Sequence, residues 1–141
     1  MKKYEILEHT ADIKLRSFGQ NKEEVFSNMA VGMFETITDL DAIDKNDEVS
    51  REIEADALDS PALLVDFLSK LLSLSDIGNE IYNRFEISFM QTDTETWWLK
   101  AHAYGYGVKR FKTEIKAVTY NELKLEENEE GNWVAEVVFD I

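Results

Sequence analysis

Two segments that carry an apolar residue at every third or fourth position constrain the fold of this chain most strongly, because each predicts a helix with one buried face. The first follows Asn21, an N-cap whose capping box is completed by Glu24. The second begins at Ser60-Pro61, a serine N-cap followed by proline at the first helical position. The apolar stripes are Val25, Phe26, Met29, Ala30, Met33, Phe34 and Ile37 in the first helix and Leu63, Leu64, Phe67, Leu68, Leu71 and Leu72 in the second.

Segments in which apolar and polar residues alternate predict strands on both sides of these helices. Thr10-Ala11-Asp12 is predicted as a corner between the first two strands, Asp39–Asp47 as a loop and Gln91–Glu95 as a turn. The order of elements predicts an α+β fold, a single domain over residues 1–141 with a mostly antiparallel β-sheet and two main helices packed on one face. The predicted strands are Tyr4–His9, Ile13–Phe18, Val49–Ala55, Ile81–Met90, Trp97–Tyr104, Lys112–Leu125 and Trp133–Phe139.

The charge balance limits the partners of this chain. Its 29 acidic residues outnumber 15 basic ones, for a net charge of −14 that is spread along the sequence. A surface of that sign repels phosphates, so direct, extensive nucleic-acid binding is disfavoured. The expected partners are cations or a basic patch on another protein. The alternative is that the charge serves only solubility.

Other features of the composition exclude several classes of protein. No apolar run approaches the roughly 20 residues that span a bilayer, and the N-terminus lacks the apolar core of a signal peptide. We therefore expect a cytoplasmic protein without membrane contact. The absence of cysteine excludes a thiolate zinc site and a cysteine nucleophile. The sequence also contains no P-loop, glycine-rich dinucleotide motif or nucleophile elbow.

Two aspartates near opposite ends of the chain are candidate metal ligands. Asp12 ends the run His9-Thr10-Ala11-Asp12, and Asp140 is followed only by Ile141. If the first and last strands lie side by side, both carboxylates and the terminal carboxylate converge. Such oxygen ligands suit Ca²⁺, Mg²⁺ or Mn²⁺. The alternatives are that Asp12 hydrogen-bonds its own corner, that His9 is structural, and that the acidic edge binds no ion.

Lys116 and the pair Trp97-Trp98 are further candidates for contacts. Lys116 shares one face of a predicted strand with Glu114, where it could hold an acidic site together, contact a phosphate or form only a solvated cross-strand pair. Trp97-Trp98 places one indole on each face of a strand. We expect one of the two in the core and the other available to a partner.

Taken together, these motifs resemble the archease family over nearly the whole chain. The matching segments are Tyr4, Leu7-Glu8-His9-Thr10-Ala11-Asp12, Gly19, Met33-Phe34, the leucine-rich second helix, Lys116-Ala117-Val118-Thr119-Tyr120 and Asp140-Ile141. The chain departs from the family pattern in the short segment Gly105–Phe111, at Asn121 and at Ser69-Lys70.

The resemblance implies a protein without catalytic activity that assists the RtcB-type tRNA-splicing RNA ligase. Family members promote guanylylation of that ligase, allow multiple turnover and can broaden its nucleotide use. The resemblance also implies a divalent metal site at Asp12, Asp140 and Ile141, the last through a main-chain or terminal oxygen. His9 and Lys116 match motif positions as accessory residues. Ca²⁺ is the expected ion for the isolated protein, with Mg²⁺ or Mn²⁺ as alternatives.

Two other interpretations of the sequence stay open. One is a stand-alone metal-dependent hydrolase or phosphotransferase, with Asp12 and Asp140 as ligands and His9 as base. The other is an acidic chaperone or protein modulator, with the helices and Trp97-Trp98 as its contact surface.

Overall fold

The computed structural model of the chain describes residues 2–9, 12–91 and 96–141. Within these ranges the chain forms two α-helices, a short 3₁₀ helix and eight strands. In chain order they are β1 (Tyr4–His9), β2 (Asp12–Gly19), α1 (Lys22–Ile37), the 3₁₀ helix Leu40–Ala42, β3 (Ile43–Ala57), α2 (Ser60–Gly78), β4 (Glu80–Gln91), β5 (Trp97–Val108), β6 (Ala117–Val118), β7 (Lys124–Glu127) and β8 (Trp133–Asp140).

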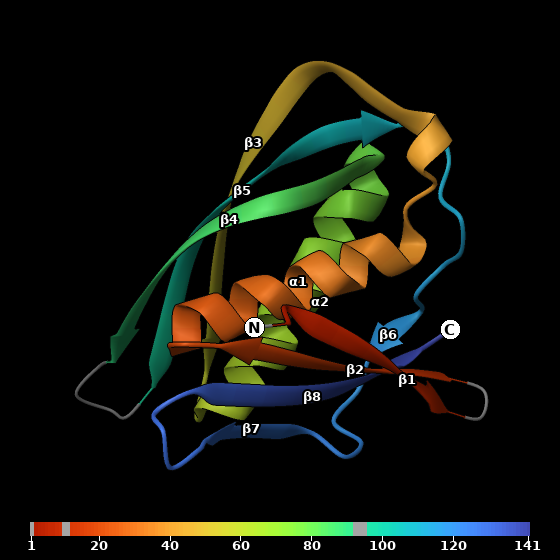
Figure 1. The fold of residues 1–141 in the computed structure, drawn as a ribbon. Coiled ribbons are helices and arrows are strands. Elements are labelled where there is room, and N and C mark those ends of the chain that lie inside the picture. The colour runs from red at the N-terminus through yellow and green to blue at the C-terminus, as the bar shows by residue number, and fades with distance from the viewer. Residues whose placement is uncertain (1, 10–11, 92–95) are drawn as a thin grey trace.

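The strands form two antiparallel sheets with the helices packed against them (Figure 1). One sheet has five strands in the order β1-β2-β8-β6, with β7 also paired to β8, and the other has the order β3-β5-β4. Helix α1 contacts β2 and β8 of the first sheet and β4 of the second, while α2 packs on β3, β4 and β5. The predicted α+β class, with two helices and antiparallel strands, is confirmed, but the strands divide between two sheets.

Both predicted helical stripes face the core, since every stripe residue is buried except the half-buried Leu72. Asn21 caps α1 as predicted, because its Oδ1 accepts a hydrogen bond from the Glu24 N–H at 2.8 Å. The predicted cap of α2 is wrong by one residue. Asp59 is the N-cap, with Oδ1 accepting from the Ala62 N–H at 2.8 Å, and Ser60 is the first helical residue. No helix in the described ranges combines the length and apolar character needed to cross a lipid bilayer.

The aspartate-rich segment predicted as a loop contains regular structure. Residues Leu40–Ala42 form a 3₁₀ helix and β3 begins at Ile43, well before the predicted start at Val49. Pairing with β5 explains this difference, since Ile43 lies opposite Val108, and the register shifts only between Asp44 and Glu48. Long-range pairing thus overrides the polar composition of the segment.

The strand predicted over Lys112–Leu125 is also wrong. Only Ala117–Val118 and Lys124–Glu127 form strands, and both pair with β8. Between them Glu122 has a φ of 52°, a left-handed backbone conformation that interrupts an extended strand.

Lys22 lies between the two sheets and contacts aromatic rings of both, near the first residue of β8. The Nζ atom of Lys22 lies 4.3 Å from the ring centroid of Trp97 on β5 and 5.2 Å from that of Trp133 on β8. It also donates a hydrogen bond to Ser60 Oγ at 3.0 Å. Burial lowers the pKa of Lys22, while the charges of Glu23 and Glu127 oppose that shift. Of the two adjacent indoles, Trp97 packs against the core.

Candidate functional site

The ends of β2, β8 and β6 bring the two predicted metal ligands together. Asp12, the first residue of β2, lies directly opposite Asp140, the last residue of β8. Ala117 of β6 pairs with Asp140 on the other side, and the Lys116 N–H donates to the Asp140 carbonyl oxygen at 2.7 Å. Figure 1 shows the C-terminus beside β6, at the end of the five-stranded sheet where β8 finishes. The last strand, β8, pairs with β2, β6 and β7, whereas the first strand, β1, pairs with β2 alone. The first and last strands are therefore not adjacent, and Asp12 reaches Asp140 because it belongs to β2.

Both carboxylates lie on the face of the sheet that points away from the core. Residues directly opposite each other in an antiparallel pair share a face, and the next pair along, Ile13 with Phe139, packs into the hydrophobic core. Asp12 is half-buried with its Oδ1 atom buried, whereas Asp140 is exposed. The Cβ atoms of such a pair are about 4.5–5.5 Å apart, close enough for both carboxylates to reach one cation.

This arrangement fits part of a metal site. The described residues contain no group of three or more His, Cys, Asp or Glu side chains placed to hold an ion. Thr10, Ala11 and the side chain of His9 lie outside the described part of the chain, so the role of the corner stays a prediction. Ca²⁺ takes about six to eight oxygen ligands. Asp12, Asp140 and an oxygen of Ile141 would supply some of them, and water or a partner would supply the rest.

Lys116 lies beside this site and lines an open cavity. The cavity has a volume of about 490 Å³ and lies between α2 and the segment of residues 111–118, with Ile37 of α1 also in its wall. Ser69, Ser73 and Asp76 line it from the helix, and Glu114 and Lys116 from the segment. The structure thus places the Lys116 backbone against Asp140 and the residue itself in the cavity wall.

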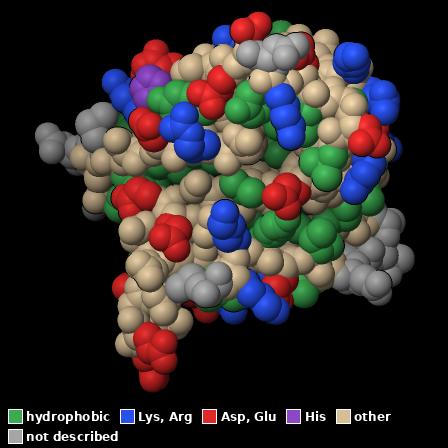
Figure 2. Space-filling model, turned by 45° about the horizontal axis from the view of Figure 1, so that its top comes forward, with side chains coloured by type: hydrophobic (Ala, Val, Ile, Leu, Met, Phe, Trp, Pro, Cys, Tyr) green, Lys and Arg blue, Asp and Glu red, His purple; other side chains and the backbone are tan. Residues whose placement is uncertain are grey.

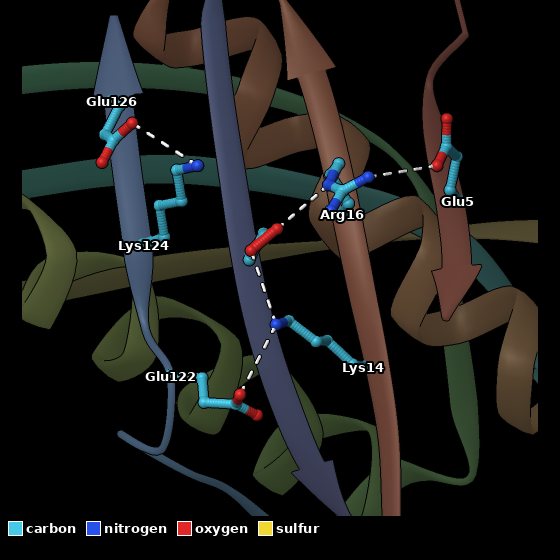
Figure 3. A network of polar contacts seen from close by, with 7 residues as sticks. Glu5, Lys14, Arg16, Glu122, Lys124 and Glu126 are labelled. Carbon is cyan, nitrogen blue, oxygen red and sulfur yellow. Dashed lines mark hydrogen bonds and ion pairs between the residues drawn. The ribbon is translucent and has the colours of Figure 1, made fainter. Parts of the chain in front are cut away.

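A charged network on the same face of the sheet was not predicted from the sequence (Figure 3). Its centre is Glu136 of β8, which is only 7% exposed. Arg16 Nε donates to Glu136 Oε2 at 3.0 Å, and Lys14 Nζ lies 3.5 Å from Glu136 Oε1. Glu5 lies 3.5 Å from Arg16, and Glu122 lies 3.9 Å from Lys14. Strand alternation places Lys14 and Arg16 on the face of Asp12, but only the β2–β8 register brings them to Glu136.

The network lowers the pKa of its central carboxyl group. Burial alone would raise the pKa of Glu136, but the hydrogen bond from Arg16 and the charges of Lys14, Arg16 and Lys124 outweigh burial. The pKa of Glu136 therefore lies below its usual value in the folded protein. A depressed carboxyl pKa contributes stability above the unfolded-state pKa, and this contribution is lost as the pH falls through the folded-state pKa.

We expect Glu136→Gln to lower the free energy of unfolding at neutral pH by about 1–3 kcal/mol, because Arg16 and Lys14 lose their shared partner. The difference from wild type should begin to shrink as the pH falls below the unfolded-state pKa of glutamate, about 4.3, and should vanish only below the depressed folded-state pKa of Glu136. Urea unfolding at neutral pH and at a series of acidic pH values measures this. The control is Glu126→Gln, an exposed residue 3.5 Å from Lys124 on the same sheet, for which less than about 0.5 kcal/mol is expected. A loss for Glu136→Gln that does not depend on pH would contradict the role assigned to its charge.

Comparisons with known proteins agree with the arrangement of the fold. The sequence model described as "Archease protein family (MTH1598/TM1083)" matches residues 4–141. The chain is 43% identical to protein archease of Methanosarcina mazei over 144 aligned residues, which cover 99% of this chain and 97% of the relative. It is 37% identical to protein archease of Pyrococcus abyssi, with both chains covered completely.

Two solved structures have the same fold. The solution structure of protein 1598 of Methanobacterium thermoautotrophicum superposes with a TM-score of 0.77 at 32% identity, with 100% of each chain covered. The crystal structure of an archease of Thermotoga maritima, described as a possible chaperone, has a TM-score of 0.61 at 21% identity and covers 100% of this chain and 98% of its own. The match to the family along nearly the whole sequence, with relatives of 37–43% identity, shows that this chain belongs to the archease protein family.

Proposed function

We propose that this archease activates an RtcB-type tRNA-splicing ligase by promoting its guanylylation and multiple turnover, and that a divalent cation at Asp12, Asp140 and Ile141 is part of that activity. Membership of the family supports the choice of partner. The observation that carries the proposal is the register of β2 and β8. It places Asp12 directly opposite Asp140, at the end of the sheet where β8 finishes.

An incomplete ligand set favours a site that is finished by the partner. Two carboxylates and an oxygen of Ile141 leave several positions of a Ca²⁺, Mg²⁺ or Mn²⁺ ion for other ligands. In nucleotidyl transfer a divalent cation shields phosphate charge and helps to orient the reacting groups. Asp12 and Asp140 would hold such an ion at the rim of the molecule, where the ligase and its nucleotide can reach it.

The charge of the chain supports a protein partner rather than RNA. A net charge of −14 repels the phosphate backbone, whereas the RNA-binding groove of a ligase must be basic. The archease would therefore approach the ligase by electrostatic attraction and would leave the RNA to it.

A ligation assay with substrate in excess over ligase tests the proposal. We expect Asp12→Asn and Asp140→Asn each to reduce the stimulation of turnover by at least about tenfold. Mutation even of residues that only hydrogen-bond to metal ligands lowers metal affinity or activity by about that factor. The control is Asp47→Asn, which removes one exposed carboxylate on the other sheet and should leave stimulation unchanged. Full stimulation by both site variants would refute the metal-dependent mechanism.

Guanylylation of the ligase across a Ca²⁺, Mg²⁺ and Mn²⁺ series identifies the ion and separates the alternatives. Turnover of phosphate esters by the purified archease alone, with Mn²⁺ or Mg²⁺, would instead support a hydrolase or phosphotransferase. Protection of unrelated proteins from aggregation without metal would support a chaperone, the role suggested for the Thermotoga maritima structure.

A further inference from the structure

We propose that the outer face of the three-stranded sheet binds an extended, arginine-bearing segment of a partner protein. This surface, called here the acidic-aromatic face, goes beyond the proposed metal site, which lies on the other sheet. We define it by the charged residues, the histidine and two of the aromatic residues that face outward from β3, β5 and β4: Glu48, Glu52, Glu54, Asp56, Trp98, Lys100, His102, Tyr104, Arg84 and Glu86.

Strand register shows that these residues share one face. Glu52 and Glu86 lie on either side of His102, and Glu54 lies opposite Lys100. The helices pack on the opposite face of this sheet, where Ile53, Ala101 and their neighbours are buried. Across the described residues of the acidic-aromatic face, every charged side chain is exposed, and Trp98 and Tyr104 are half-buried. The face is therefore accessible and has aromatic rings within it.

The charge of this face is locally negative. Figure 2 shows acidic and basic side chains interspersed on one side of the molecule. The acidic-aromatic face carries five carboxylates and two cations, Arg84 and Lys100, a surplus of three negative charges. Its potential should attract basic groups and repel phosphates.

The internal ion pairs leave particular carboxylates available. Arg84 lies 3.5 Å from Glu48 and 3.4 Å from Glu86, and Lys100 lies 3.7 Å from Glu54. Glu52 Oε1 lies 3.9 Å from His102 Nε2. Among the residues that the structure describes, no lysine or arginine pairs with Glu52 or Asp56. These two carboxylates lie on the same strand, four residues apart, or about 13 Å at strand spacing. Basic side chains four positions apart on one face of an extended segment would match that spacing, and a segment with a basic residue at every second position contains such pairs.

The aromatic rings favour arginine over lysine. The Cζ atom of Arg84 lies 3.9 Å from the ring centroid of Tyr104, so the sheet already stacks one guanidinium on an aromatic side chain. Trp98 lies directly opposite Asp56. An incoming guanidinium could therefore contact an indole and a carboxylate together, since its planar group both stacks on rings and pairs with carboxylates.

Titration of the ¹⁵N-labelled protein by a short peptide of alternating arginine and serine tests this inference. We expect amide shifts centred on Glu52–Asp56 and Trp98–His102, and weaker shifts with the matching lysine-serine peptide. Glu52→Lys combined with Asp56→Lys should raise Kd about tenfold at physiological salt. The control, Glu126→Lys with Glu129→Lys on the other sheet and the turn after it, changes the net charge equally and should raise Kd about twofold or less.

Two further measurements separate a specific surface from general attraction. Trp98→Leu should remove most of the preference for arginine over lysine, and a dispersed amide spectrum confirms that the variant is folded. Ca²⁺ binding should be the same in Glu52→Lys/Asp56→Lys as in wild type. Failure of this inference is therefore distinct from failure of the metal site. Equal weakening by the two double variants, or equal shifts with a single-stranded RNA oligonucleotide, would overturn the proposal.

Discussion

Asp140→Asn is expected to stabilise the metal-free protein and to abolish its stabilisation by Ca²⁺. Asp140 lies directly opposite Asp12 across the β2–β8 pair, and like charges at directly opposed positions of a sheet repel each other. Removing one charge should therefore raise the free energy of unfolding by about 0.2–1 kcal/mol in the absence of metal. With Ca²⁺ bound, the wild type should instead be more stable than the variant. An ion that binds only the folded state raises the free energy of unfolding by about 2.7 kcal/mol when the free ion is 100-fold above Kd.

Thermal unfolding with excess chelator and with excess Ca²⁺ measures both effects on the same samples. The wild type should have a higher Tm in Ca²⁺ than in chelator. In chelator the Tm of Asp140→Asn should be higher than that of the wild type, and Ca²⁺ should not raise it further. Asp47→Asn serves again as the control and should respond to Ca²⁺ like the wild type. An Asp140→Asn protein that keeps the Ca²⁺ response would show that the ion binds elsewhere. An equal or lower Tm in chelator would show that the two carboxylates do not repel each other.

The candidate site could be predicted from the sequence only in part. The positions of Asp12 and Asp140 near the chain ends made them candidates, but their pairing depends on which strand lies beside the last one. The strand that brings Asp12 to Asp140 is β2, of which Asp12 is the first residue, and not β1. Glu136 could not be predicted as a partner of Lys14 and Arg16, because no local pattern specifies the register of strands so distant in the sequence.

The helices were predictable because their determinants are local. An apolar stripe and an N-cap lie within one segment, and for α1 both were confirmed. Strand boundaries depend on pairing with distant residues, which is why the start of β3 and the division between β6 and β7 were predicted wrongly. The capping error at Asp59 has a local cause, since aspartate and serine are both good caps and stand next to each other.

Close contacts between strands are a third class of determinant that sequence patterns do not show. Gly105 lies on β5 opposite Tyr82 of β4, beside a register shift between Tyr82 and Arg84. A Cβ atom at Gly105 would lie 1.8 Å from the Ile81 carbonyl oxygen and 2.7 Å from the Tyr82 Cα atom. Both contacts are with backbone, so no side-chain rotation can relieve them. Glycine is therefore required at this position by the close approach of β4.

Gly105→Ala is accordingly expected to lower the free energy of unfolding by about 3 kcal/mol, at the upper end of the cost of overpacking. Gly107→Ala is the matched control on the same strand, because its nearest contact would be the Asn79 carbonyl oxygen at 3.9 Å, an ordinary van der Waals distance. That variant should change stability by less than about 1 kcal/mol, with reduced freedom of the unfolded chain acting in its favour. Urea unfolding of the two proteins decides the matter. Equal stability would mean that β4 moves aside at little cost, and that the irregular pairing at Tyr82 does not depend on glycine.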